Sequence, residues 1–179
     1  MNSIAKILLM VLLSIMLSGQ VSAQTSPNKL EIGFNVSRYQ KDIGLGLHLI
    51  SPYFIKEKIA IKAGANLLWF EYFNGSETTF SLYQNFQLGI KVRNAIFSDK
   101  LFMYGEGGFL TILPNSAFSS ESSVFGGYGL FGIEFRPSQK AAYFVELGGV
   151  GSGAIADKIA GEPKYSNGFL INVGYRIGL

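Results

Sequence analysis

The chain contains no cysteine among its 179 residues, and only 15% of its residues are charged. The missing thiols exclude disulfides and thiolate metal sites, and they also exclude lipid anchoring through a cysteine. A metal site built from several histidines is also excluded, because His48 is the single histidine of the chain. Soluble proteins carry charge on roughly 25% of their residues, so the low charge content argues against a surface that is fully exposed to water.

Long apolar runs are also missing, apart from one near the start. The apolar stretch Ile7–Leu17 follows the basic residue Lys6 and precedes the small residues Val21–Ala23. This order is typical of a cleavable secretory signal peptide, and the stretch is shorter than the roughly 20 residues that span a membrane. We therefore predict an exported chain with a signal peptide at residues 1–23 and one domain at residues 24–179. An uncleaved membrane anchor is the alternative.

The sequence also lacks a large excess of charge of either sign. The formal net charge is +3, and the basic residues form no dense run along the chain. Because nucleic-acid-binding domains carry clusters of lysine and arginine, no nucleic acid partner is expected. The glycine-rich segment Gly127–Gly132 lacks the lysine that phosphate-binding loops require. We expect no cofactor and no metal.

Hydrophobicity is present in quantity, but it is spread through short segments. Mean hydropathy is +0.27, and 14% of the residues are aromatic. Eight segments alternate apolar with small or polar residues, and this period of two indicates β-strands. They cover residues 29–38, 42–51, 57–70, 78–93, 99–112, 122–136, 140–151 and 165–179. Because a bilayer admits only helices and closed barrels, we predict an all-β fold, an eight-stranded antiparallel transmembrane β-barrel with up-and-down meander topology.

The two faces of each segment differ, and the difference predicts which face is the inner one. The polar faces are rich in glycine, asparagine and tyrosine and too poor in charge to coat a surface in water. We therefore expect the apolar faces to contact lipid, with a soluble exported ligand-binding barrel as the alternative. The last segment closes the barrel, and its outward face consists of Phe169, Ile171, Val173, Tyr175, Ile177 and Leu179.

The connections between the segments are short at one end and longer at the other. Short turns are expected at residues 52–56, 94–98 and 137–139, and the opposite end carries a tight turn at 39–41 followed by polar loops at 71–78, 113–122 and 153–165. Outer-membrane barrels show this asymmetry, with short periplasmic turns and longer outer loops. In strand number, loop asymmetry, the motif YGEGGF (Tyr104–Phe109) and the alternating terminal segment, the chain resembles the small eight-stranded outer-membrane barrels of the OmpA, OmpX and opacity-protein type.

The resemblance implies a location in the cell outer membrane of a Gram-negative envelope, in contact with lipid and lipopolysaccharide. It also implies insertion by the barrel-assembly machinery, which reads the terminal strand. Such strands typically end on an aromatic residue, whereas this chain ends on Leu179.

Charged residues within the segments fall on the inward face. Four acids and four bases share this parity: Glu31, Lys62, Lys91, Arg93, Glu106, Glu134, Glu146 and Arg176. Eight strands enclose a space that side chains can fill, so we expect a packed, charge-paired lumen, with a narrow water or ion path as the alternative. Because the first and seventh segments flank the last one, Glu31 or Glu146 is predicted to pair with Arg176.

The sequence shows no constellation for catalysis. His48 is expected to be a hydrogen-bonded lumen residue near the periplasmic end, so Ser51 beside it lies at the wrong end for the histidine–serine pair of lipid A deacylases, which this chain resembles in size. Paired carboxylates would need an open cleft to hydrolyse a glycoside. We predict a non-enzymatic outer-membrane protein that serves envelope structure or surface interaction through its loops. The alternatives are an envelope-lipid-modifying enzyme and a narrow pore or ligand carrier.

Aromatic and apolar residues near the segment ends suggest further contacts. Two interfacial girdles are expected, formed by Tyr53 and Phe54 at the periplasmic end and by Trp69, Phe70, Tyr72 and Phe80 at the outer end. Four apolar side chains project from polar loops, either toward a partner such as lipopolysaccharide or onto each other: Phe73, Phe118, Ile155 and Ile159.

Overall fold

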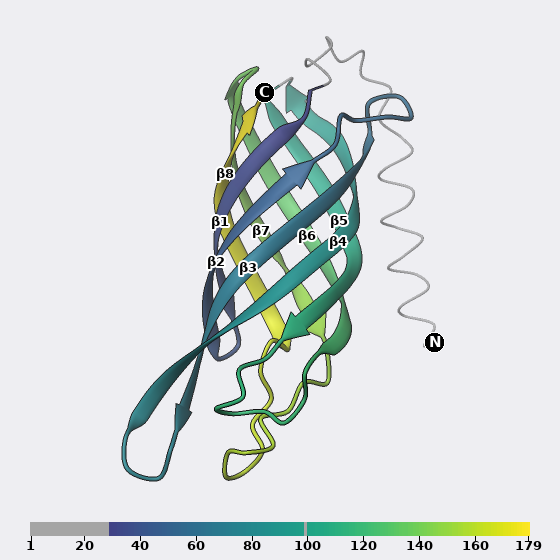
Figure 1. Ribbon diagram of the computed structural model, residues 1–179. Helices are drawn as coiled ribbons and strands as arrows, with labels where there is room; N and C mark the ends of the chain where they lie inside the picture. The colour runs from purple at the N-terminus through teal and green to yellow at the C-terminus, as the bar shows by residue number, and fades with distance from the viewer. Residues whose placement is uncertain (1–28, 99) are drawn as a thin grey trace, which may run out of the picture.

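The computed structural model describes residues 29–98 and 100–179 and folds them into a closed antiparallel β-barrel (Figure 1). The strands are β1 (Glu31–Tyr39), β2 (Asp42–Ile50), β3 (Ile59–Phe73), β4 (Thr78–Ser98), β5 (Leu101–Leu113), β6 (Val124–Ser138), β7 (Ala141–Gly151) and β8 (Gly168–Gly178). Each strand pairs with the next, and β8 pairs back onto β1. The predicted eight-stranded meander is confirmed. The predicted signal peptide, residues 1–23, lies outside the described residues.

The last residue takes part in closing the sheet. The backbone N–H of Leu179 donates to the carbonyl oxygen of Leu30 at 2.9 Å, one step beyond the last paired residues of β8 and β1. The described chain therefore starts and finishes at the same end of the barrel, which we call the terminal end, and the opposite end is the loop end. Within the described ranges, no helix has the length and hydrophobicity needed to cross a membrane.

Two strands are longer than the sequence pattern predicts. The turn expected at residues 94–98 is wrong, because Asn94 and Ala95 continue the pairing of β4 with β5 before an irregularity that ends at Ser98. β3 also runs past residue 70 to Phe73, so the β3–β4 hairpin projects beyond the rest of the loop end (Figure 1). At its tip, the side-chain oxygen of Asn74 accepts the N–H groups of the following turn residues.

The alternation of apolar with small or polar residues in the sequence corresponds to an alternation of exposed and buried side chains around the barrel. In β1 and β2 every second residue is buried. The outward positions are largely apolar, with Phe109 80% and Leu88 58% exposed, whereas the inward Arg176 is 1% exposed. A barrel with apolar side chains outside and ionised ones inside is the arrangement that a bilayer stabilises.

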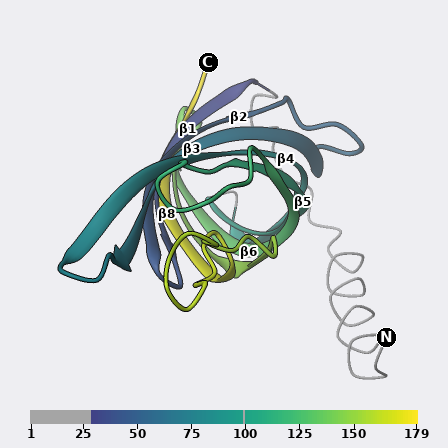
Figure 2. The same ribbon diagram turned by 60° about the horizontal axis from the view of Figure 1, so that its bottom comes forward.

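Two loops close the barrel at the loop end (Figure 2). Phe118, from the β5–β6 loop, and Tyr165, from the β7–β8 loop, have their ring centroids 4.9 Å apart. They pack on strand residues that point inward, among them Phe70 and Tyr83. Because these rings are buried, the loop end is capped by a hydrophobic cluster rather than left open. We call these four rings, together with Tyr39 and Tyr72 beside them, the aromatic cap.

Candidate functional site

The lumen is held together by one arginine that contacts four other strands. Arg176, on β8, donates from Nε to His48 Nε2 at 3.0 Å and from Nη2 to Glu146 Oε1 at 2.7 Å. Its Nη2 also donates to the Tyr104 hydroxyl at 3.2 Å, and its Nη1 donates to Glu134. Of the two partners expected for Arg176, the structure shows Glu146.

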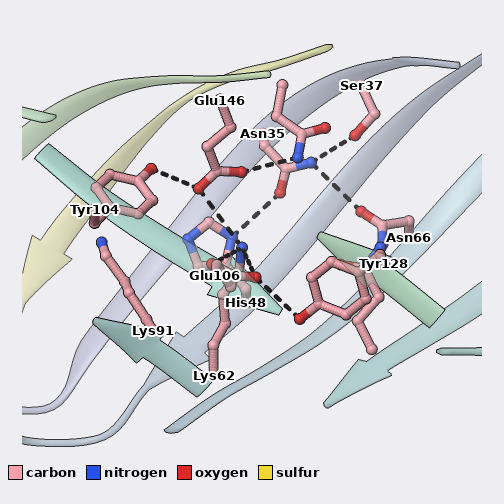
Figure 3. Close-up of polar contacts among 12 residues, drawn as sticks. Asn35, Ser37, His48, Lys62, Asn66, Lys91, Tyr104, Glu106, Tyr128 and Glu146 are labelled. Atoms are coloured by element: carbon pink, nitrogen blue, oxygen red, sulfur yellow. Dashed lines mark hydrogen bonds and ion pairs between the residues drawn. The ribbon is translucent and has the colours of Figure 1, made fainter. Parts of the chain in front are cut away.

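The two lumen lysines reach across strands rather than to their register neighbours. Lys91 lies opposite Glu106 in the β4–β5 ladder, yet its Nζ pairs with Glu134 on β6 at 2.8 Å. Lys62, on β3, pairs with Glu106 on β5 at 2.9 Å (Figure 3). Each carboxylate is therefore bonded to a cation from a strand that is not adjacent to its own.

Arg136 belongs to this network although the sequence analysis did not include it. Its Nη2 lies 2.5 Å from Glu31 Oε1, and its Nε lies 2.6 Å from Glu134 Oε1. The parity that places Glu134 inward also covers Arg136, two residues further on, and that signal could have found it. Arg136 is the last residue of the predicted segment 122–136, next to the turn predicted at 137–139.

The lumen keeps equal numbers of acids and bases when two further buried residues are included. Arg136 adds a fifth base, and the buried Asp42 near the loop end adds a fifth acid. Among the five bases, Arg93 forms no ion pair, since no described carboxylate lies within ion-pair distance of it. Its guanidinium instead lies 3.5 Å from the centre of the Tyr53 ring, and its Nε donates to the Glu57 carbonyl at 3.4 Å.

A column of amide side chains connects the charged layer to the aromatic cap, and Figure 3 shows its first members, Asn35 and Asn66. Since His48 Nε2 accepts from Arg176, the ring proton resides on Nδ1 and is donated to Asn35 Oδ1 at 3.2 Å. The column continues through Asn66 and Asn85. It ends where Asn85 Nδ2 donates to the hydroxyl of Tyr39 at 3.1 Å, within the aromatic cap. The inward parity of these amides was visible in the sequence, but their connection was not.

Two polar contacts hold the loops over the lumen. Asp42 Oδ2 accepts the Tyr83 hydroxyl at 2.6 Å and the Ser166 backbone N–H at 2.7 Å. Between the loops, Asp157 Oδ1 accepts the Ser120 N–H at 2.8 Å, and its Oδ2 accepts the Ser120 hydroxyl. These hydrogen bonds from Ser120 lower the pKa of the Asp157 carboxyl. We call the pair formed by Asp157 and Ser120 the loop clasp.

The expected aromatic girdles are only partly correct. Phe70 and Tyr72 pack within the aromatic cap, because they share the inward parity of β3, and Tyr53 is buried beside Arg93. Phe54 and Phe80 are exposed, as a girdle requires. The four apolar loop residues divide in the same way: Phe118 is buried in the cap and Ile159 packs against it, while Phe73 and Ile155 remain exposed.

An open groove of about 1030 Å³ lies at the loop end, between the β1–β2 turn, the β3–β4 hairpin and the β7–β8 loop. Its charged lining consists of Arg38, Lys41, Lys158 and Glu71, and its apolar lining includes Tyr72, Phe73, Ile159 and Pro163. Arg38 and Lys41 come from the end of β1 and the β1–β2 turn, and the other charged residues and these four apolar residues come from the hairpin extension and the β7–β8 loop. The arrangement can bind an anionic group beside an apolar surface.

The described part of the chain contains neither a cluster of metal ligands nor a histidine–serine pair. No three His, Asp or Glu side chains there gather as metal ligands. The histidine is held between Arg176 and Asn35. Neither of its ring nitrogens is directed at a serine hydroxyl, and the lumen carboxylates are engaged by cations and hydroxyls.

No family model matches the sequence, and no curated protein matches it. Among solved structures, the N-terminal β-barrel domain of Pseudomonas aeruginosa OprF is similar, with a TM-score of 0.59 and 12% sequence identity over 85% of this chain and 98% of that one. The attachment invasion locus protein Ail of Yersinia pestis has a TM-score of 0.44 and 12% identity over 84% of this chain and 95% of its own. At such identity a structural likeness concerns the fold and not the activity. With its closed meander and its apolar outward face, this chain has the fold of the small eight-stranded outer-membrane β-barrels.

Proposed function

We propose that the protein is exported by the signal peptide predicted at residues 1–23 and acts in the outer membrane as a closed, non-enzymatic barrel. Its terminal end faces the periplasm, and its loop end faces outward, as short turns and longer loops favour. The barrel stabilises the envelope, and its loop end is the surface that meets lipopolysaccharide or other partners. The observation that carries this proposal is a lumen that is filled by ion pairs and capped by rings.

The packing of the interior favours a closed barrel over a pore. An ion crossing it would have to pass the buried side chains of Lys91 and Arg176, which both bind Glu134. It would then meet the aromatic cap, where Phe118 is completely buried. Breaking a buried ion pair costs about 3–5 kcal/mol, so a conducting path would require several such losses at once.

The same packing favours a structural over an enzymatic role. Glycosidase carboxylates flank an open cleft, whereas Glu106 and Glu146 are buried against Lys62, Tyr104 and Tyr128. A lipid-modifying histidine–serine pair needs a histidine at the membrane surface, and the ring of His48 is buried in the lumen.

The terminal strand supports insertion by the barrel-assembly machinery. β8 alternates outward apolar residues with inward residues that are small or polar apart from Leu170. The backbone N–H of Leu179 adds a hydrogen bond to Leu30, just before β1.

The decisive experiment compares unboiled and boiled protein from purified outer membranes on a detergent gel, followed by reconstitution in planar bilayers. A closed outer-membrane barrel gives heat-dependent mobility and no steady conductance, while a general porin in the same bilayer conducts. Mobility that does not change on boiling would contradict the barrel proposal. Stable channels would contradict the closed lumen, and release of fatty acid from lipid A would contradict the non-enzymatic role.

A further inference from the structure

The groove concentrates the positive charge of the loop end. Arg38, Lys41 and Lys158 line it together with a single acid, Glu71. Elsewhere on the loops the described charges are mainly negative, with Glu77, Glu121, Asp157 and Glu162 against Lys164. The groove is therefore a basic site within an otherwise acidic surface, and that contrast favours an anionic occupant.

The cations of the groove remain available to a ligand. Among the described residues, neither Arg38 nor Lys41 forms a salt bridge. Lys158 Nζ donates to the Ser116 carbonyl at 2.8 Å, which leaves its charge uncompensated. The nearby Asp42 carboxylate is buried and already accepts two hydrogen bonds from Tyr83 and Ser166. Asp42 attracts Arg38 and Lys41 without forming an ion pair with either, so a phosphate would give these cations a direct partner.

The groove also lies where the apolar belt of the barrel ends. Arg38 continues the outward face of β1 after Val36, and it is paired with Ile43 on β2 and Ile171 on β8. Phe73, 61% exposed, lines the groove from the hairpin. A ligand there meets cations and apolar side chains together, which suits the junction between a lipid headgroup and its acyl chains. This setting favours an amphiphile over a purely polar anion such as an acidic polysaccharide.

We propose that this groove binds the phosphorylated headgroup of an outer-leaflet glycolipid of the lipid A type. Arg38, Lys41 and Lys158 contact its phosphates, and Phe73 and Ile159 contact its apolar part. The groove volume of about 1030 Å³ can hold such a headgroup. This inference rests on the proposed function in one respect, since it requires the loop end to face the outer leaflet.

The test uses the whole folded protein in detergent micelles and two probes, bisphosphorylated lipid A and the same lipid after removal of both phosphates. Binding is measured as the lipid-bound fraction in native mass spectrometry. The native protein is expected to bind the phosphorylated lipid at least tenfold more tightly. A basic side chain near an anionic lipid surface contributes about fivefold, so the triple variant Arg38→Gln, Lys41→Gln and Lys158→Gln should lose on the order of a hundredfold.

A matched control removes three exposed lysines from the terminal end, with Lys29→Gln, Lys56→Gln and Lys140→Gln, and it should bind the phosphorylated lipid like the native protein. Heat-dependent gel mobility establishes that both variants are folded. Equal binding of the two lipids by the native protein would overturn the inference, and so would equal losses in the two triple variants. Tighter binding of heparin, dependent on the same three cations, would overturn the choice of occupant. None of these outcomes alters gel mobility or conductance, so the proposed function is tested separately.

Discussion

Arg176, on β8, donates hydrogen bonds to residues on β2, β5, β6 and β7. One side chain therefore connects five of the eight strands across the lumen. Replacing it with leucine leaves Glu146 with hydrogen bonds to Tyr104 and Asn172 and with the longer ion pair to Lys62 at 3.7 Å. Because removing one partner of a buried ion pair leaves an uncompensated charge, Arg176→Leu should lower the free energy of unfolding by about 3–5 kcal/mol. Urea unfolding in lipid vesicles measures the loss.

A double-mutant cycle separates the pair from the rest of the network. Arg176→Leu combined with Glu146→Leu should cost less than the sum of the two single losses, by at least about 1 kcal/mol. Glu31→Leu is the comparison, since Glu31 binds Arg136 and not Arg176, and its coupling to Arg176 should be smaller. Strictly additive losses for the Glu146 pair would contradict the direct interaction.

The partners of these residues show what the sequence could and could not predict. Parity placed Glu106, Glu134 and Arg176 on the inward face, because the period of two is a local property of a strand. Their pairing depends on the stagger of strands around the barrel, which brings Lys91 to Glu134 instead of its register neighbour Glu106. No spacing along the chain encodes that stagger directly.

The β6–β7 ladder offers a test at the level of a strand pair. Gly148 faces inward, and a Cβ added there would lie 2.0 Å from the Gly129 carbonyl oxygen. Gly129 faces outward, and a Cβ added to it would meet nothing within 4 Å. We expect Gly148→Ala to destabilise the barrel by about 1–3 kcal/mol through overpacking. Gly129→Ala should be neutral or stabilising by up to about 1 kcal/mol. Equal effects in urea unfolding would show that the two faces are not distinguished.

The loop clasp predicts a dependence on pH. Its hydrogen bonds from Ser120 lower the pKa of Asp157 in the folded protein, so the ionised carboxylate stabilises the closed loops above the ordinary aspartate pKa. That contribution is lost as the pH falls through the lowered value. Hydrogen exchange at the Ser120 amide, corrected for its intrinsic rate, should lose protection over this range, and Asp157→Asn should show weak protection throughout. The Ala156 amide, bonded to the Pro163 carbonyl, serves as a control that should not follow this titration.

The ends of the elements were harder to predict than their interiors. Asn94 resembled a turn residue, yet it pairs with Met103 because β4 extends through an irregularity before the chain reverses. Phe118 and Tyr165 lie in polar loops, and only the tertiary fold shows that they cover the same opening. Local alternation predicts strands well, whereas the closure of the loop end depends on contacts between residues far apart in the chain.

Compared with a soluble protein, the whole molecule is inverted, with apolar side chains outside and ion pairs inside. Substitution of an exposed leucine tests this arrangement directly. Leu88 is 58% exposed on the outward face of β4, between Ala63 and Phe109. On a water-facing surface Leu88→Arg would be harmless, because it replaces an exposed apolar group with a charge. On a lipid-facing surface near the bilayer midplane it should cost about 2–4 kcal/mol. Ser76→Arg, in the exposed tip of the β3–β4 hairpin, introduces the same side chain outside the belt and should change stability little. Unfolding in vesicles, with both variants measured side by side, would contradict a membrane-spanning barrel if Leu88→Arg proved as well tolerated as Ser76→Arg.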